Sequence, residues 1–525
     1  MEGRRTCRGP VAPPALLTWL ALVGSLLMVA SLLMLGGAET AAAHAGHAHT
    51  KQARLAHAAG PKAPLGHAGR WVTDRKGRVV VLHGVNMVYK RPPYHPAAIG
   101  FNGPDADFLK RHGFNTVRLG LIYAGVEPQP GQYDAAYIRT VRRTEKVLAK
   151  RRIFSMIDFH QDLYNEKFTG EGFPAWATID DGFPAEPLTG FSQTYITSPG
   201  LNRAFANLWA NRTGPGGVGL QDRYAAAWQR VALAFRRRQY NLGYDIINEP
   251  WPGNPTFLTC ASTEGCPAFE QQMLAPMQQK AINAIRTADG RHLVWYEPVV
   301  TTQFGTKYHH PDTGDPKAGM SFHIYCLTGG AGAASDSECE TLEELSLNNA
   351  QERAKLNGDT LLLSEFGATD REPVIERMVD RADRNMVSWQ WWHYCGCNDP
   401  TTTGPGDTQA LIKDPKAPPT GDNLFLDKIK LLERPYPQAV AGTPERYFFK
   451  RESRRFELVF SKKRASGSGR FRRGLSDVFV PKLHYPQGYR AEVSGAKVLS
   501  KRNRQHLILR GMPAAQKVTV TITPR

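Results

Sequence analysis

Two glutamates, Glu249 and Glu365, stand where a carboxylate could carry out chemistry. Each follows an apolar run of strand length, residues 244–247 before the first and residues 360–363 before the second. Pro250 ends the first run, because proline has no backbone N–H with which to continue a strand. The end of a strand is where a parallel barrel holds its reactive groups. Two carboxylates placed there can serve as a proton donor and an anionic partner on opposite sides of a sugar, as cleavage of a glycosidic bond requires.

The elements that must position these glutamates alternate between strand and helix. Strands are predicted over residues 79–86, 115–119, 153–159, 244–247, 292–297, 320–325, 360–365 and 386–392. Helices are predicted over residues 106–112, 137–150, 224–237, 268–287, 342–355, 374–384 and 422–433. A long loop, residues 160–220, follows the third strand and is rich in glycine, proline and aromatic residues, which is typical of a functional loop. The alternation predicts an α/β fold, a (β/α)8 TIM barrel over residues 70–436.

The spacing of apolar residues along the sequence changes after residue 436. Phe456, Leu458 and Phe460 alternate with other residues, and so do the apolar residues of 518–522, which is the spacing of strands with one buried face. We expect residues 437–525 to form an antiparallel β-sandwich. This segment holds 20 lysines and arginines against five acidic residues, so its net charge is +15 of the +18 carried by the chain. The basic character therefore belongs to the C-terminal domain rather than to the barrel.

The N-terminal segment is typical of a secreted protein. Basic residues precede an apolar stretch over 15–35, and the small residues 41–43 follow it, so residues 1–43 are predicted to be a signal peptide. An uncleaved membrane anchor is the alternative, because the apolar stretch is long. Residues 44–69 are rich in alanine, glycine and histidine. They are interpreted as a disordered linker rather than a metal site, since nothing fixes the histidines in one geometry.

Six of the seven cysteines form near neighbours along the chain. They are Cys260 and Cys266, Cys326 and Cys339, and Cys395 and Cys397. An even number behind a signal sequence predicts disulfides, of which Cys260–Cys266 is the best supported because both cysteines lie in one loop. Zinc is the alternative, but no pair has the Cys-x-x-Cys spacing of structural zinc sites. These observations predict a secreted or extracellular protein that holds no metal.

The motifs around the two glutamates resemble a known family. Asn248-Glu249-Pro250 together with Ser364-Glu365-Phe366-Gly367 is similar to family 5 of the retaining glycoside hydrolases. Residues 248–253, with the Asp-Phe-His-Gln-Asp string of residues 158–162, resemble the endoglycoceramidase branch of that family. The resemblance extends from about Trp71 to the C-terminus and is weakest in the last ninety or so residues. It implies a barrel with two catalytic glutamates.

The resemblance also implies a role for residues around the catalytic pair. Glu249 matches the acid/base and Glu365 the nucleophile, whereas the sequence pattern alone could not assign the two roles. Asn248 matches the residue that binds the sugar 2-hydroxyl. Arg118 matches an arginine that supports the nucleophile, which is compatible with a buried structural ion pair. His323 and Tyr325 match the His-x-Tyr pair, with Tyr325 on the nucleophile and His323 on the sugar; core packing is the alternative for both.

A second group of residues is expected to bind sugar and lipid. His160 and Asp162 match residues of the endoglycoceramidase branch that bind the first sugar, and Lys90 matches a sugar-binding lysine. Trp392 is favoured over Trp389 and Trp391 as the aromatic platform under the sugar. Five aromatic residues of the long loop are candidates for an apolar wall on the lipid side, with packing of the loop as the alternative: Phe168, Phe173, Trp176, Phe191 and Tyr195.

The resemblance implies a secreted retaining endo-glycosidase that cleaves the oligosaccharide–ceramide bond of glycosphingolipids and needs no cofactor. The alternatives are another family 5 β-glycosidase, such as a steryl or lipid glucosidase or an endoglucanase, and a non-catalytic glycolipid-binding protein. We expect a glycosphingolipid substrate, a monomer and no nucleic-acid partner. Because the substrate would sit in a membrane, the basic residues of 437–525 are expected to dock the barrel on an anionic bilayer.

Overall fold

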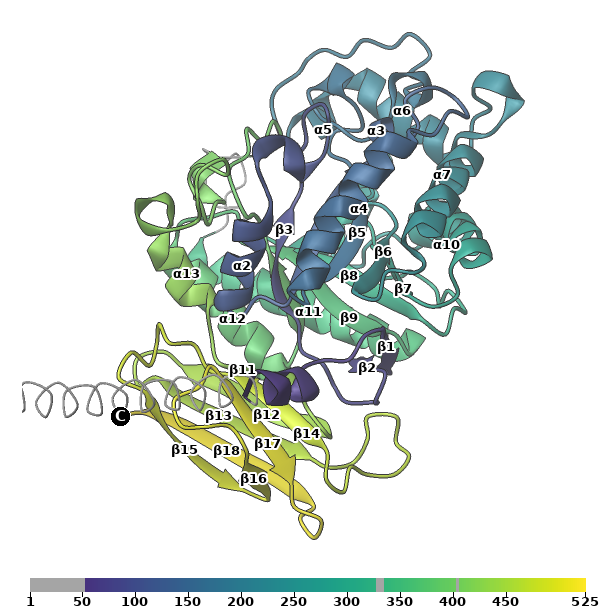
Figure 1. Ribbon diagram of the computed structural model, residues 1–525. Coiled ribbons are helices and arrows are strands. Elements are labelled where there is room, and N and C mark those ends of the chain that lie inside the picture. The colour runs from purple at the N-terminus through teal and green to yellow at the C-terminus, as the bar shows by residue number, and fades with distance from the viewer. Residues whose placement is uncertain (1–51, 327–334, 403–405) are drawn as a thin grey trace, which may run out of the picture. The chain divides into compact units, whose positions relative to one another are not determined.

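The computed structural model describes residues 52–326, 335–402 and 406–525, and residues 59–525 form one compact unit. Eight parallel strands close into a barrel in the order β10-β3-β4-β5-β6-β7-β8-β9. The predicted TIM barrel is therefore confirmed (Figure 1). The strands are β3 (His83–Met87), β4 (Thr116–Ile122), β5 (Phe154–His160), β6 (Asn241–Asp245), β7 (Leu293–Tyr296), β8 (Ala318–Ile324), β9 (Thr360–Phe366) and β10 (Ser388–Trp391).

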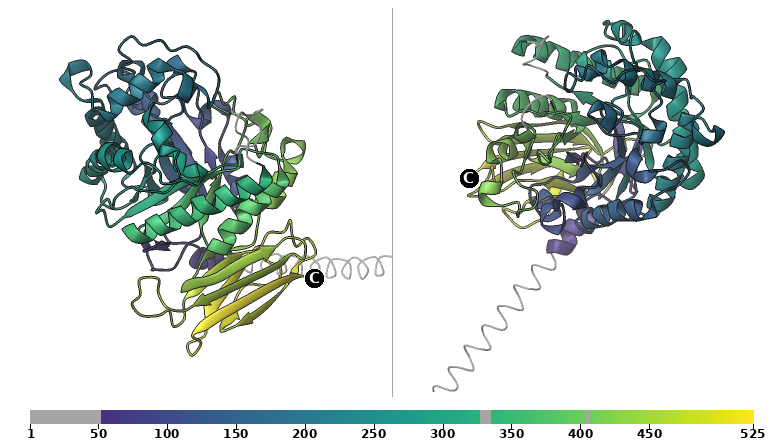
Figure 2. Two further views of the ribbon diagram at one scale, coloured as in Figure 1. Left: turned by 180° about the vertical axis from the view of Figure 1, so that it is seen from behind. Right: turned by 90° about the horizontal axis from the view of Figure 1, so that it is seen from above.

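Helices cover the outside of the strands (Figure 1 and Figure 2). They are α2 (Gly103–Arg111), α4 (Ala135–Lys150), α7 (Leu220–Phe235), α10 (Ala275–Ala288), α11 (Asp336–Asn357), α12 (Glu372–Asn385) and α13 (Leu426–Leu432). The structure describes every residue between β7 and β8, and this connection contains the 3-10 helix η6 (Val300–Phe304) but no α-helix. Capping side chains set several helix starts, because the first backbone N–H groups of a helix lack partners. Asp134, for example, accepts hydrogen bonds from the N–H groups of Ala136 and Tyr137 at the start of α4.

The long loop after β5 is more ordered than the sequence predicted. It contains α5 (Thr194–Thr197) and α6 (Pro199–Trp209), and Ser198 caps α6 with Pro199 in its first turn. Serine followed by proline is a helix-start signal that could have been read from the sequence. Phe168 and Phe173 are buried in the barrel core, which matches the packing alternative for these aromatic residues.

The C-terminal residues form the predicted β-sandwich of two four-stranded antiparallel sheets, β11-β14-β17-β16 and β12-β13-β18-β15. The apolar residues that alternate in the sequence, such as Phe456 and Leu458, are buried between the sheets. The strands are β11 (Tyr436–Ala439), β12 (Thr443–Lys450), β13 (Arg455–Ser461), β14 (Leu475–Phe479), β15 (Tyr489–Ser494), β16 (Ala496–Val498), β17 (His506–Gly511) and β18 (Lys517–Pro524).

The sandwich packs against the amino-terminal ends of the barrel strands. The Tyr436 ring stacks on His83, the first residue of β3, with 3.8 Å between ring centroids. The Tyr436 hydroxyl donates to the carbonyl of Gly113 just before β4 (2.6 Å). Arg434 pairs with Asp383 (2.9 Å) in the last turns of α12, which also contacts β12. A membrane bound by the sandwich would face this closed end, so the expectation that residues 437–525 dock the barrel opening on a bilayer is not supported.

The ordered part of the chain begins earlier than predicted. Residues 65–68 form strand β1 (Leu65–Ala68), which pairs with β2 (Trp71–Asp74), although the sequence placed them in a disordered linker. Leu65 and Val72 anchor this hairpin in a core cluster. The proposed signal peptide, its apolar stretch and Cys7 lie outside the described residues. Within those residues, no helix is long and apolar enough to cross a membrane.

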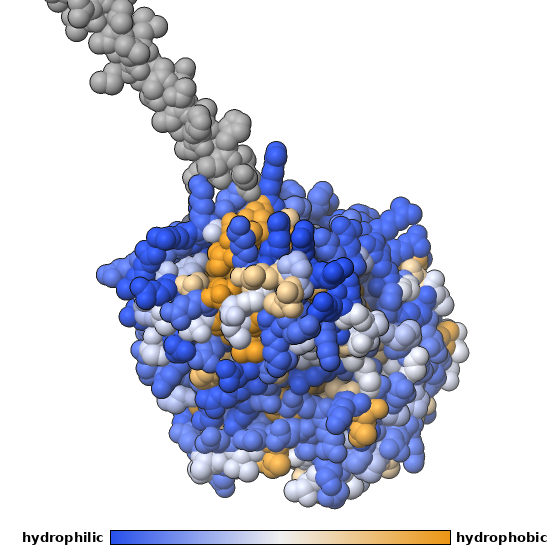
Figure 3. Space-filling view, turned by 90° about the horizontal axis from the view of Figure 1, so that it is seen from below, coloured by the Kyte–Doolittle hydropathy of each residue, from blue (hydrophilic) through white to orange (hydrophobic). Residues whose placement is uncertain are grey.

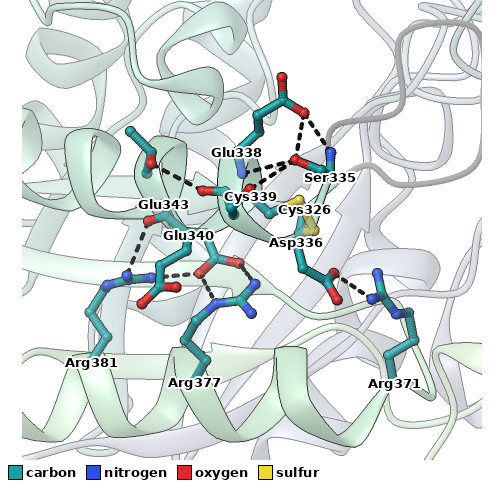
Figure 4. Close-up of a disulfide and its surroundings, with 12 residues drawn as sticks. Cys326, Ser335, Asp336, Glu338, Cys339, Glu340, Glu343, Arg371, Arg377 and Arg381 are labelled. Carbon is teal, nitrogen blue, oxygen red and sulfur yellow. Dashed lines mark hydrogen bonds and ion pairs between the residues drawn. A yellow bond between two sulfur atoms is a disulfide. The ribbon is translucent and has the colours of Figure 1, made fainter.

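All three predicted disulfides are present: Cys260–Cys266, Cys326–Cys339 and Cys395–Cys397. Cys326 follows β8 directly and Cys339 lies in the first turns of α11, so this bridge ties the carboxyl end of a barrel strand to the next helix (Figure 4). On the same helix, Glu343 pairs with Arg377 (2.8 Å) and with Arg381 (2.5 Å) of α12. The bridge and the ion pairs together hold α11 against the barrel.

Because six of seven cysteines are bridged, we expect the full chain to show one titratable thiol after denaturation without reductant. Removing the Cys326–Cys339 bridge by a double serine substitution should lower the free energy of unfolding by about 3 kcal/mol, as expected for a disulfide that closes a loop of about this length. Thiol titration and urea unfolding measure the two quantities. Six free thiols at the paired cysteines in protein recovered from the culture medium would contradict the disulfides and the oxidising compartment they imply.

Candidate active site

Glu249 and Glu365 come together at the carboxyl-terminal end of the barrel, called here the mouth. Glu365 is the penultimate residue of β9. Glu249 lies four residues beyond β6 and has a positive φ of 43°. Oxygens of the two carboxylates and a ring nitrogen of His323 lie within 4.8 Å of one another. Both side chains are largely buried, with 11% of Glu249 and 5% of Glu365 exposed. The pair predicted from the sequence is therefore assembled by the fold.

Arg118 forms the electrostatic centre beneath this pair. Its guanidinium is fully buried and contacts one oxygen of Glu365. Further carboxylates surround it: Asp245 at 2.7 Å, Glu297 at 2.8 Å and Asp158 at 3.1 Å. A single cation thus holds four buried carboxylates in fixed positions, which the planar, five-donor guanidinium can do and a lysine could not. The supporting role predicted for Arg118 agrees with this geometry.

The surroundings of the two glutamates differ in a way that suits different roles. Both oxygens of Glu365 accept hydrogen bonds, one from Arg118 and one from the Tyr325 hydroxyl (2.8 Å), an arrangement made for an anion. The Glu249 side chain accepts one, from His323 Nδ1 (2.9 Å). Burial raises the pKa of Glu249, the hydrogen bond and charge of His323 oppose this shift, and the negative charges of Glu365 and Asp162 add to it. A raised pKa suits the proton donor that the sequence predicted at Glu249.

The other residues predicted beside the pair are in place. The Asn248 side chain accepts from Arg118 (2.9 Å) and donates to the Gln161 carbonyl (3.0 Å), and it lines the cavity. His323 lies behind the cavity wall, between Glu249 and Glu297. Burial opposes a charge on His323, but the carboxylates of Glu297 and Glu365 raise its pKa well above the ordinary value. The raised pKa favours a positive charge on His323 between the carboxylates, and the sugar contact expected of His323 stays a prediction.

The predicted sugar-binding residues form a second buried cluster beside the pair. Lys90 donates to Asp162 (2.5 Å), and its ammonium lies 4.6 Å from the centre of the Trp392 ring. His160 stacks on the Trp392 ring, with 5.2 Å between ring centroids, and lies 3.3 Å from Asp162. Lys90, Asp162 and Trp392 line the cavity, whereas His160 lies behind them. Trp389 and Trp391 are fully buried, so the choice of Trp392 as the platform is supported.

Several residues of this cluster were not found from the sequence. Asp399 (3.3 Å) and Thr401 (2.6 Å) contact Lys90 from the irregular loop after β10. Glu171, in the long loop, is buried, and its carboxyl has no hydrogen-bond partner among the described residues. Burial raises the pKa of Glu171 well above its usual range, against the opposing charge of Lys90, which favours the neutral carboxyl. The loops that carry these residues have no periodic pattern, whereas Glu297 ends a predicted strand and could have been noticed.

The cavity at the mouth has a volume of about 920 Å³, including its opening, and two chemically distinct halves. Lys90, Asp162, Thr401 and Gln409 line the polar half with Trp392. The other half is apolar, lined by Phe191, Tyr195, Ile196, Trp251, Phe257, Val300 and Phe304. Phe191 and Tyr195 are thus the two predicted wall aromatics that reach the cavity. Glu249 and Glu365 line the same cavity.

Within the described residues, three groups of side chains bring possible metal ligands within 4.8 Å of one another. One is the catalytic pair with His323, and a second is His160, Asp162 and Glu171. In both, the protein supplies its own cation, because Arg118 contacts Glu365 and Lys90 contacts Asp162. The third is His393 with Cys395 and Cys397, whose sulfurs form a disulfide.

Replacing Lys90 by methionine should be strongly destabilising, because it leaves the buried carboxylates of Asp162 and Asp399 without their cation. We expect a loss of about 3–5 kcal/mol in the free energy of unfolding, measured by urea denaturation near pH 7. Burial opposes ionisation of Asp162, but Lys90 and His160 outweigh it and lower its pKa to about 2. This contribution is therefore present above pH 4 and is lost as the pH falls through 2.

Lys167→Met is the matched control, since Lys167 is half exposed and pairs with Asp180 in the same long loop. It should change stability by at most about 1 kcal/mol. Equal effects of the two substitutions would contradict the buried ion cluster.

Comparison with known proteins agrees with the geometry. Residues 74–398 match the cellulase domain of glycosyl hydrolase family 5, and residues 434–523 match the glycoside hydrolase family 5 C-terminal domain. Endoglycoceramidase I of Rhodococcus hoagii (strain 103S) is 32% identical over 446 residues, which cover 82% of each chain. The endoglycoceramidase of Hydra vulgaris is 28% identical over 485 residues, covering 85% of this chain and 86% of the other.

A solved structure shares the whole architecture. Endo-glycoceramidase II from a Rhodococcus species, in complex with the ganglioside GM3, superposes with a TM-score of 0.68 at 27% identity. The alignment covers 87% of this chain and 99% of the other. Membership of one family therefore accounts for the barrel, the sandwich and the two strand-end glutamates. The chain belongs to glycoside hydrolase family 5, within its endoglycoceramidase branch, and is an O-glycosyl hydrolase.

Proposed function

We propose that this protein is a retaining endo-glycosidase that hydrolyses the bond between oligosaccharide and ceramide in glycosphingolipids, and that it works outside the cell. The observation that carries the proposal is a single cavity that is lined by a polar group of side chains, an apolar group of side chains and the carboxylate pair. Such a cavity suits a substrate with a sugar at one end and a lipid at the other. The relative that binds ganglioside GM3 supports the same substrate class.

The separation of the carboxylates supports retention of anomeric configuration. Retaining enzymes hold their two carboxyl groups about 5–5.5 Å apart, whereas inverting enzymes need about 6.5–9.5 Å to admit a water molecule. Oxygens of Glu249 and Glu365 within 4.8 Å of each other agree with the shorter separation. This distance supports direct attack of Glu365 on the sugar.

In the first step, an oxygen of Glu365 attacks the anomeric carbon of the sugar next to ceramide. The bond from that carbon to the ceramide oxygen breaks, and the proton of Glu249 passes to this oxygen. Ceramide therefore departs as a neutral alcohol. The sugar remains bound to Glu365 as an ester. Tyr325 and Arg118, which hold Glu365 in the free enzyme, orient the attacking carboxylate.

In the second step, Glu249 is ionised and accepts a proton from a water molecule. The water oxygen bonds to the anomeric carbon, the ester bond to Glu365 breaks, and the intact oligosaccharide leaves. Glu249 regains its proton and Glu365 its charge, so both groups return to their starting states. Asn248, on the cavity wall and held by Arg118, is placed beside the reacting sugar.

The products distinguish this proposal from its alternatives. The protein is incubated separately with a ganglioside, lactosylceramide, glucosylceramide, a steryl glucoside and a cellulose oligomer, with Glu365→Gln as the inactive control. Thin-layer chromatography and mass spectrometry should show ceramide and an intact oligosaccharide, and proton NMR should show the β-anomer first. Cleavage of the steryl glucoside or the cellulose oligomer alone would assign a different family 5 activity, and cleavage of none would leave only binding.

The three disulfides support a location outside the cell, because such bridges persist in oxidising compartments. Expression with the native N-terminus, followed by assay of medium, membrane and cell lysate, tests this part of the proposal. Activity confined to the lysate would contradict it.

A further inference from the structure

Three loops around the opening of the cavity carry almost no charge. They span residues 182–198, 250–263 and 298–306 and are called here the rim loops; each contributes side chains to the cavity wall. Their forty residues include a single charged side chain, Glu186, whereas 22% of the whole chain is charged. A protein surface in contact only with water normally carries many charged side chains. The rim loops therefore differ from the rest of the surface.

The rim loops also expose large apolar side chains. The exposed fraction is 75% for Leu258, 52% for Ile196, 49% for Phe183 and 36% for Leu188. Ile196 both lines the cavity and reaches the outside, as does the half-buried Phe257 next to Leu258. The apolar half of the cavity thus continues without interruption onto the surface of the protein. Continuous exposed apolar surface of this kind marks contact with a protein or a membrane.

Specific contacts hold the rim loops together. The Asn254 side chain donates to the Ile196 carbonyl (2.8 Å), and the Trp251 ring lies between those of Tyr195 and Phe257 at 4.9 and 4.6 Å. The Thr197 hydroxyl donates to the Pro187 carbonyl (3.0 Å), which places the loop of Leu188 beside Ile196. These contacts make the exposed side chains one organised face.

We propose that the rim loops insert into the bilayer that carries the substrate, so that the mouth lies directly on the membrane surface. The proposal rests on the proposed function, since it takes the lipid half of the substrate to be ceramide. A bilayer fits this face because the ceramide chains lie in the hydrocarbon while the bond to be cleaved lies at the interface, and a mouth seated there reaches that bond without extracting the lipid.

This arrangement assigns membrane contact to the end opposite the sandwich. The sandwich covers the amino-terminal ends of the barrel strands. The face of the molecule seen from below is mostly hydrophilic, with one apolar strip and a few small apolar patches (Figure 3). Insertion of uncharged apolar side chains depends on buried area rather than on charge. Binding should therefore depend weakly on salt and on anionic lipid, in contrast to docking by the basic residues of 437–525.

The test uses the double variant Leu188→Asp/Leu258→Asp, whose positions are exposed and do not line the cavity. The matched control is Leu356→Asp/Met512→Asp, at positions 67% and 52% exposed in the last turn of α11 and in the sandwich. Both proteins and the wild type are sedimented with phosphatidylcholine vesicles containing lactosylceramide, with or without phosphatidylserine, at low and high salt. We expect the rim variant to bind about tenfold more weakly and the control within about twofold of the wild type.

A second readout separates docking from catalysis. The rim variant should hydrolyse a soluble aryl lactoside, and lactosylceramide in detergent micelles, at the wild-type rate, but lactosylceramide in vesicles about tenfold more slowly. Unchanged vesicle binding, binding that follows lipid charge and salt, or a lipid-free dimer abolished by the rim variant would each overturn the proposal. If the wild type cleaves no lactosylceramide even in micelles, the proposed function fails as well, and the docking proposal falls with its substrate.

Discussion

Replacing Glu365 by glutamine should lower turnover of all glycosides, natural or activated, by about four orders of magnitude or more. An amide cannot form the ester on which a double displacement depends. The fold should survive, because glutamine has the same shape and can keep both neighbours: its oxygen accepts from Arg118, and its amide donates to the Tyr325 oxygen, whose hydroxyl can rotate. Initial rates on an aryl lactoside and on lactosylceramide, with a thermal unfolding curve, measure the two effects.

A covalent label provides the control for this prediction. A 2-deoxy-2-fluoro lactoside with a good leaving group should inactivate the wild type by accumulating the glycosyl ester, and peptide mass spectrometry should locate the sugar on Glu365. Glu365→Gln should remain unlabelled. A sugar found on Glu249, or a Glu365→Gln variant with substantial activity on activated substrates, would reverse or remove the assigned role.

Glu249→Gln should separate substrates by their need for a proton. Turnover of lactosylceramide should fall by about two to four orders of magnitude, because the ceramide oxygen leaves slowly without a proton. An aryl lactoside with a strongly acidic phenol needs no proton to leave, so formation of its glycosyl ester should remain close to the wild-type rate. Pre-steady-state kinetics should then show a burst of phenol, because hydrolysis of the ester still requires a general base.

The pH profile gives an independent measurement of the same residue. Burial raises the pKa of Glu249, so the proton needed for the first step is present below that pKa and lost above it. In the wild type, kcat/KM on lactosylceramide should fall on the alkaline side, and Glu249→Gln should lack this limb. Equal losses on activated and natural substrates, or an unchanged alkaline limb, would be inconsistent with Glu249 as the acid.

The barrel and its catalytic pair could be predicted because they depend on local regularities. Buried parallel strands are continuous apolar runs, and helices repeat every three to four residues, so both leave a readable pattern. Motifs at strand ends then identified Glu249 and Glu365. The alternation of Phe456 and Leu458 predicted the sandwich for the same reason. Trp392 was separable from its neighbours because it ends the strand motif, whereas Trp389 and Trp391 precede it.

Residues on irregular loops could not be predicted in the same way. Asp399 and Thr401 reach Lys90 from the loop after β10, and Glu171 reaches the same cluster from the loop after β5. No period relates such residues to a face, because the direction of a loop side chain depends on contacts far away in the sequence. The raised pKa of Glu171 likewise depends on burial, which a sequence does not display.

The sequence by itself determined which elements form, in which order, and which two carboxylates are the candidates for the chemistry, since these follow from residue type and spacing. Only the tertiary structure decided what surrounds those groups. It placed His323 between Glu249 and Glu297, gathered four carboxylates around Arg118, and packed the basic sandwich against the amino-terminal ends of the barrel strands. Each outcome depends on packing between distant segments, because the free energy of a buried charge or an exposed apolar side chain is set by its neighbours in space.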